Sequence, residues 1–151
     1  MIRRATVADV PVLVAMGLRF VASTSYAALI PADPDRLTAF FHGLLEAGVV
    51  FVAERQDQAV GMIGATVFDH PMSGERTACE VCWWVEPDAR GGRSALWLLT
   101  AAEQWATAEG ARRFQMIAPA GSSAGALYQR RGYSEVETTF QRPLTSSAEG
   151  Q

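Results

Sequence analysis

The sequence has no long uninterrupted apolar run. A membrane-spanning helix needs about 18 or more consecutive apolar residues, and the chain contains no such stretch. The first residues, Met1 to Thr6, include two arginines and lack the apolar core of a signal peptide. We therefore expect a cytoplasmic protein without a membrane partner.

An excess of basic residues is also missing. The chain has 13 Lys and Arg residues against 16 Asp and Glu residues, which gives a net charge of −3. A nucleic-acid-binding surface normally needs a basic excess, so we expect no nucleic-acid partner. The 151 residues are 49% hydrophobic and 19% charged, as in ordinary globular proteins. We predict one domain over residues 1–144 and a short disordered polar tail over residues 145–151.

Cysteine is scarce, and its two copies lie close together. Cys79 and Cys82 have the C-x-x-C spacing of some redox and metal sites. They fall in a strand-like run, where residues i and i+3 face opposite sides of a sheet. The only histidines, His42 and His70, are distant in sequence. We expect two buried small side chains and no metal site, with a zinc or redox site as the alternative.

Hydrophobic periodicity and turn residues predict an α/β fold. The expected order is β-α-α-β-β-β-α-β-α-β, a mixed and mostly antiparallel central sheet flanked by helices. The predicted strands and helices, in chain order, are a strand at 2–5, helices at 10–21 and 34–47, strands at 49–53, 59–68 and 77–85, a helix at 95–109, a strand at 114–118, a helix at 124–131 and a last strand within 133–144.

A glycine-containing turn follows the strand at 77–85. Arg90, Gly91, Gly92 and Arg93 lead directly into the next predicted helix. The first N–H groups of a helix have no internal partner, and the helix dipole favours an anion there. This junction is therefore typical of a phosphate or pyrophosphate site, with a plain basic turn as the alternative. The residue patterns of a P-loop and of a dinucleotide fingerprint are absent.

Two motifs and the element order resemble those of the GNAT superfamily of acetyl-CoA-dependent N-acyltransferases. Arg90-x-x-Arg93-x-Ala95 is similar to the pyrophosphate signature Arg/Gln-x-x-Gly-x-Gly/Ala. The stretch from Ala124 to Tyr133 is similar to the pattern Asn-x-x-Ala-x-x-Leu-Tyr-x-x-x-Gly-Phe. The Trp-rich strand followed by Pro-x-x-Arg-Gly-Gly is similar to a small phage and bacterial subgroup. Together these features cover nearly the whole chain.

The resemblance implies a cofactor site and a single-domain GNAT-like fold. Acetyl-CoA would be the acyl donor, and its pyrophosphate would bind the backbone of Arg90, Gly91, Gly92, Arg93, Ser94 and Ala95. Its pantetheine arm would meet backbone groups of Trp84 and Val85, like an added strand. The expected acceptor is a small-molecule or peptide amine, and no metal is needed. A homodimer is common in the family and stays open.

Two side chains are candidate catalytic groups. Tyr128 would act as general acid toward the departing thiolate, with core packing as the alternative role. Glu80 lies in an otherwise apolar strand and would act as general base, directly or through water. Strand alternation predicts that Glu80 shares a sheet face with Cys82 and Trp84. The alternative for Glu80 is a structural salt bridge or an exposed edge position, while Glu86 and His70 are weaker candidates for the base.

The chain departs from the family pattern at two positions. Arg93 stands where the signature has glycine, and Gly121 stands where the family often has asparagine. These departures keep two other functions open: a non-catalytic acyl-CoA-binding or sensing module, and an interaction domain that has lost the cofactor. We expect the substrate pocket between the first two helices, their connection at 25–31 and the loop at 70–75.

Overall fold

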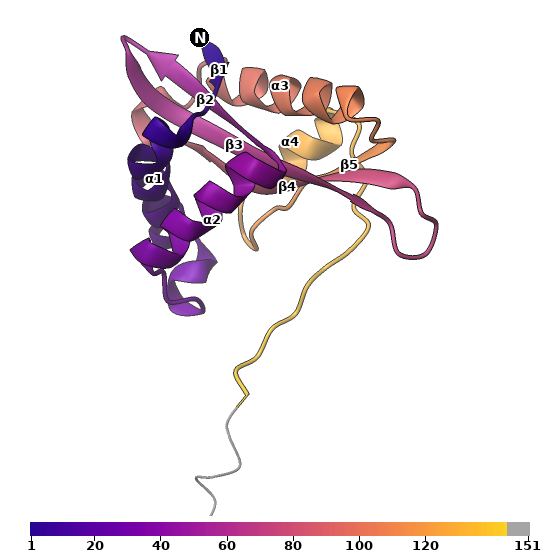
Figure 1. Cartoon of the computed structure of the whole chain (residues 1–151). Coiled ribbons are helices and arrows are strands. Elements are labelled where there is room, and N and C mark those ends of the chain that lie inside the picture. Colours follow the sequence, from indigo (N-terminus) through magenta and orange to yellow (C-terminus); the bar gives the residue numbers. More distant parts are fainter. Residues whose placement is uncertain (145–151) are drawn as a thin grey trace, which may run out of the picture.

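The computed structural model describes residues 1–144, so the tail predicted for residues 145–151 lies outside the described part. Figure 1 shows a twisted sheet with helices against both faces. The elements are β1 (Ile2–Arg4), α1 (Val10–Ser23), α2 (Pro34–Ala47), β2 (Val49–Arg55), β3 (Gln58–Asp69), β4 (Arg76–Val85), α3 (Ser94–Ala108), β5 (Arg113–Gln115) and α4 (Ala124–Arg130), with short 3-10 turns at Val7–Asp9, Ser25–Ala28 and Pro87–Ala89.

The sheet follows the chain order from β1 to β5. Each neighbouring pair is antiparallel except β4 and β5, which run parallel. The helix α3 makes the crossover that a parallel pair requires. The predicted α/β class with a mixed, mostly antiparallel sheet is therefore confirmed.

The last predicted strand is wrong. Residues 133–144 form no strand, and the outer edge of β5 pairs with no other segment among residues 1–144. Its β-favouring residues, Tyr133, Val136, Thr138, Thr139 and Phe140, are compatible with a strand, but a strand also needs a partner edge. A sequence pattern indicates that a segment can form a strand, but it does not indicate whether another strand lies beside it in the fold.

Capping residues mark the start of two helical segments. The side chain of Asp33 accepts a hydrogen bond from the backbone N–H of Asp35 at 2.8 Å, and Pro34 is the first residue of α2. Thr6 and Asp9 form a capping box before α1. The Asp9 carboxylate also pairs with Arg3 at 2.8 Å, which lowers the pKa of Asp9 to about 2. This ion pair joins β1 to the start of α1.

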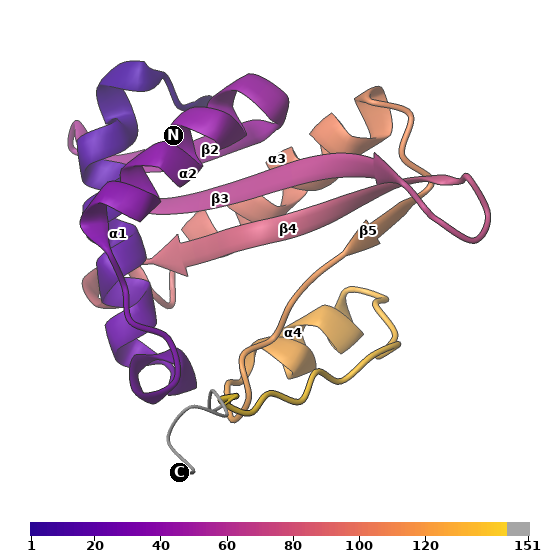
Figure 2. The same ribbon diagram turned by 60° about the horizontal axis from the view of Figure 1, so that its bottom comes forward.

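The two faces of the sheet have separate cores. Helices α1 and α2 cover one face, and α3 covers the other (Figure 2). The first core includes Leu13, Phe41, Met62 and Trp84, all buried. The second core gathers side chains of the central strands under α3, including Ile63, Val85, Leu98 and Leu99. Helix α4 lies on the α3 side, where Arg131 at its end pairs with Glu103 of α3.

A β-bulge interrupts β4 after Glu80. In the β3–β4 ladder Ala65 faces Glu80 and Gly64 faces Cys82, so Val81 is an extra residue on β4. Val81 and Cys82 both pack toward α1 and α2, on the face that also holds Trp84. The bulge therefore reverses the alternation of β4 at its midpoint.

The bulge overturns two predictions that rest on strict alternation. Glu80 faces Ala65, whose core cluster lies under α3, so Glu80 does not share a face with Cys82 and Trp84. The same shift places Cys79 and Cys82 on one face, and both are free thiols. An inserted residue changes the parity of every position that follows it.

Candidate active site

The site lies where β4 and β5 separate. Their parallel pairing ends at Cys79 and Gln115, so β4 has no strand neighbour on that side from Glu80 onward. Figure 2 shows the chain after β5 bending away from β4 toward α4. An open edge of this kind exposes backbone hydrogen-bonding groups in the middle of a sheet.

Glu80 is a buried carboxyl at this point of separation. Glu80 is only 5% exposed, and its Oε2 accepts a hydrogen bond from the backbone N–H of Ile117 at 3.1 Å. Burial raises the pKa of Glu80 to about 7, an effect that the Ile117 hydrogen bond partly opposes. No arginine pairs with Glu80 among the residues that the structure describes, so the salt-bridge alternative receives no support there. A carboxyl with this pKa can take up a proton at neutral pH.

Tyr128 reaches the same residue from α4. Its hydroxyl donates a hydrogen bond to the carbonyl of Ile117 at 2.8 Å, and its ring stacks on Trp83 at a centroid distance of 5.8 Å. Burial, and then the nearby charge of Glu80, raise the pKa of Tyr128 above its usual value. The phenol therefore stays protonated at neutral pH and keeps a proton to donate. Ile117 therefore binds both candidate catalytic groups: its N–H bonds Glu80 and its carbonyl bonds Tyr128. This residue was not identified from the sequence.

The glycine turn has the geometry of an anion-binding junction. Gly91 adopts a φ of 84°, in the left-handed region that favours glycine, and Arg93 precedes the first residue of α3. No side chain caps this helix start, so the N–H groups of Ser94 and Ala95 have no partner from a cap. The backbone of Arg93 is ordinary right-handed helical, with φ −91° and ψ −8°, which arginine adopts without strain.

Arg90 folds back onto the end of β4. Its Nε donates a hydrogen bond to the carbonyl of Val85 at 2.9 Å, and its guanidinium carbon lies 4.6 Å from the centre of the Trp84 ring. The indole Nε1 atoms of Trp83 and Trp84 are buried, and neither has a hydrogen-bond partner within residues 1–144. Buried donors of this kind are rare unless a ligand or water satisfies them.

A pocket opens on the face of α1 and α2. Its volume is about 320 Å³, and residues of α1, the 25–28 turn, α2, β3 and β4 line it: Gly17, Phe20, Val21, Tyr26, Ile30, Leu37, Phe40, Phe41, Met62, Val81 and Cys82. The helices and their connection were predicted to form the substrate pocket. The loop at 70–75, also predicted, does not line it. The bulge residues Val81 and Cys82 form part of its wall and connect it to the open stretch of β4.

The weaker candidates for the base lie elsewhere. The Glu86 carboxylate forms an ion pair with Arg19, which links the end of β4 to α1. His70 lies in the turn between β3 and β4, beyond the far end of their ladder from the glycine turn, and its Nδ1 accepts from the N–H of Met72. Neither is at the point where β4 and β5 separate.

Comparison with known proteins identifies the family. The model of the acetyltransferase (GNAT) family matches residues 19–133, which is most of the chain and includes the glycine turn and Tyr128. The chain belongs to the GNAT acetyltransferase family. No curated protein matches its sequence significantly.

Solved GNAT structures share the fold at low sequence identity. A predicted acetyltransferase from Clostridium acetobutylicum, with acetyl-CoA, is 19% identical with a TM-score of 0.78, and the match covers 95% of each chain. An aminoglycoside antibiotic 6′-N-acetyltransferase from Acinetobacter haemolyticus is 18% identical with a TM-score of 0.75, covering 97% of this chain and 99% of that one. A ribosomal-protein-alanine N-acetyltransferase from Brucella melitensis is 17% identical with a TM-score of 0.75, covering 95% and 99%.

The described part of this GNAT protein shows neither a membrane helix nor a metal cluster. No helix within residues 1–144 is long and apolar enough to cross a membrane. Within the same range, no three or more His, Cys, Asp and Glu side chains gather in an arrangement that could hold a metal ion.

Proposed function

We propose that this protein transfers the acetyl group of acetyl-CoA to a primary amine by direct attack in a ternary complex. One observation carries the proposal. A buried carboxyl with a pKa of about 7 and a protonated phenol are held on the same residue, Ile117, at the open edge of β4. Acyl transfer to an amine needs a proton acceptor for the amine and a proton donor for the thiolate.

The residues present fit acetyl-CoA. The uncapped start of α3 and the turn from Arg90 to Ala95 would hold the pyrophosphate with backbone N–H groups. The β4 edge at Trp84 and Val85 would meet the pantetheine amides, which extend a sheet as a strand does. When bound, acetyl-CoA supplies the activated acetyl group as a thioester.

Glu80 and Tyr128 would divide the proton transfers between them. Glu80, as the carboxylate, takes a proton from the amine, directly or through one water, so that the nitrogen can attack the carbonyl carbon. The new C–N bond forms as the C–S bond breaks. Tyr128 gives its phenolic proton to the departing sulfur, and bulk water restores both groups. No covalent enzyme intermediate is needed, because the amine itself is the nucleophile.

A non-catalytic acyl-CoA-binding or sensing module is the second candidate. Two departures at the cofactor turn keep it open. Arg93 occupies the signature's glycine position, and Arg90 is engaged by Val85 and Trp84 in this structure. Such a module would bind acyl-CoA but would not transfer the acyl group to an amine.

Thiol release separates the two functions. The purified protein is mixed with acetyl-CoA and a panel of amines, and free CoA is detected with a thiol reagent. Amine-dependent release supports the acetyltransferase. A rise in melting temperature with acetyl-CoA but no release with any amine supports the binding module, and the absence of both contradicts each of them.

A further inference from the structure

The pocket on the α1 and α2 face contains no charged side chain. Its eleven lining residues are apolar or aromatic except for the hydroxyl of Tyr26 and the thiol of Cys82. Burial raises the pKa of Cys82, so its thiol is neutral. A second ammonium or a carboxylate on the substrate would lose its hydration there without finding a partner. The composition of the pocket therefore excludes polycationic amines and zwitterionic acceptors.

The size and walls of the pocket indicate an aromatic guest. A cavity of about 150 Å³ holds benzene, and this pocket has a volume of about 320 Å³. It has room for one or two rings with a short side chain. Four aromatic side chains, Phe20, Tyr26, Phe40 and Phe41, stand around it, and Phe20 already contacts Tyr26 and Trp84 edge-on or tilted. Aromatic walls favour aromatic guests in offset or edge-on contact.

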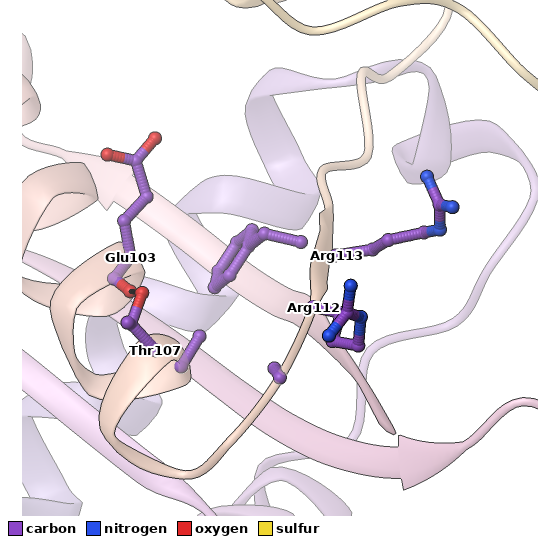
Figure 3. A pocket seen from close by; sticks show the side chains of 7 residues that line it. Glu103, Thr107, Arg112 and Arg113 are labelled. Carbon is purple, nitrogen blue, oxygen red and sulfur yellow. Dashed lines mark hydrogen bonds between the residues drawn. The ribbon is translucent and has the colours of Figure 1, made fainter. Parts of the chain in front are cut away.

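The position of the pocket connects it to the chemistry. Val81 and Cys82 line it, on the stretch of β4 that has no strand neighbour toward β5, whereas Glu80 faces α3 on the other side of the sheet. The open edge of β4 therefore joins the pocket to the proposed acetyl site. Neither Val81 nor Cys82 lines the second hollow of the described chain, of about 200 Å³, between β5 and the second half of α3 (Figure 3). An apolar pocket also favours the neutral form of a bound amine, because burial disfavours the ammonium. The neutral amine is the nucleophile that the reaction requires.

We propose that the acceptor is a primary amine on an apolar, aromatic body, such as an aryl-alkyl amine. This proposal rests on the proposed function, since the pocket is assigned to the acetyl acceptor. It names a substrate class that net charge and family membership do not give.

The test compares amines that each carry at least one primary amino group. 2-Phenylethylamine, ethanolamine and spermidine are each assayed with acetyl-CoA by thiol release. We expect kcat/KM for 2-phenylethylamine to exceed that for the other two at least about tenfold, which corresponds to about 1.4 kcal/mol. Equal or better use of ethanolamine or spermidine overturns the substrate class while leaving acetyl transfer intact.

Two substitutions to arginine at neighbouring positions test whether the preference for 2-phenylethylamine arises in the pocket. Ile30 lines the pocket and Leu29 does not, and both are partly exposed. Ile30→Arg should reduce kcat/KM for 2-phenylethylamine at least tenfold, and Leu29→Arg should leave it unchanged. If no amine releases thiol, the acetyltransferase function fails, and calorimetric binding of 2-phenylethylamine decides the pocket: binding lost only in Ile30→Arg supports the proposal, and no binding to the unmodified protein overturns it.

Discussion

Glu80 is an acid held where its neutral form is favoured. Ala65 faces it across the ladder, the core under α3 surrounds it, and one backbone N–H is its only hydrogen-bond donor within the described chain. A carboxylate in such a place lowers the stability of the free protein. A group that destabilises the fold is more easily explained by the chemistry of the site than by structure.

Substitution of Glu80 separates these effects. Glu80→Gln keeps an acceptor for the Ile117 N–H but cannot take a proton. We expect kcat to fall by about 100-fold or more, and the rise of activity through pH 7 to disappear. Steady-state rates between pH 5.5 and 9 measure this, with Glu109→Gln at the far end of α3 as the control. An unchanged pH profile would exclude Glu80 as the base.

The same variant changes stability with a defined sign. The folded pKa of Glu80, about 7, lies above the ordinary glutamate pKa of 4.5, so the folded state binds more protons between these two pH values. The unmodified protein therefore loses stability as pH rises from about 4.5 to 7, and Glu80→Gln does not. At pH 8 the variant should be more stable by about 3 kcal/mol, and at pH 4 the difference should vanish. Urea unfolding at both pH values gives the comparison.

Tyr128 should affect chemistry more than binding. Tyr128→Phe keeps the ring that stacks on Trp83 and removes the hydroxyl bonded to Ile117. We expect kcat to fall about 100-fold while the dissociation constant of acetyl-CoA changes by less than about threefold. Single-turnover rates and calorimetry provide the two numbers. A loss of affinity with an unchanged rate at saturation would make Tyr128 a structural residue.

At the scale of elements, the junction between α2 and β2 depends on a close approach. A Cβ at Gly48 would lie 2.3 Å from the carbonyl oxygen of Ala65, whereas a Cβ at Gly43, inside α2, meets nothing within 4 Å. Gly48→Ala should therefore lower the free energy of unfolding by about 2 kcal/mol or more. Gly43→Ala should raise it by about 0.5–1 kcal/mol, because alanine favours a helix interior. Opposite signs in urea unfolding support the geometry, and equal signs contradict it.

Most elements could be predicted from the sequence because their signals are local. The Asp33-Pro34 start of α2, the glycine turn before α3 and the β2–β3 hairpin depend on neighbouring residues, and all three are present. The bulge at Val81 could not be predicted, because nothing in an apolar strand marks the extra residue. The role of Ile117 was equally hidden, since a backbone group acts there and a sequence describes side chains.

For the whole molecule, acetyl-CoA should act as a stabilising ligand. At about 100 times its dissociation constant, a ligand that binds only the folded state adds about 2.7 kcal/mol. For a chain of 151 residues this is a rise in melting temperature of about 5–10 °C. Arg93→Glu, which places a negative charge at the start of α3, should remove most of the rise. Arg36→Glu, in the first turn of α2, should retain it in the same thermal scans.

The shared residue at the centre of the site gives this protein a built-in spectroscopic reporter. The amide proton of Ile117 points at a carboxyl that titrates near pH 7, so its chemical shift should follow that ionisation without any label beyond ¹⁵N. The Ile117 carbonyl accepts the hydrogen bond of the Tyr128 hydroxyl, so the ¹³C resonance of that carbonyl should respond to Tyr128 as well. One residue thus allows both proposed proton-transfer groups to be observed in the resting protein, separately from turnover.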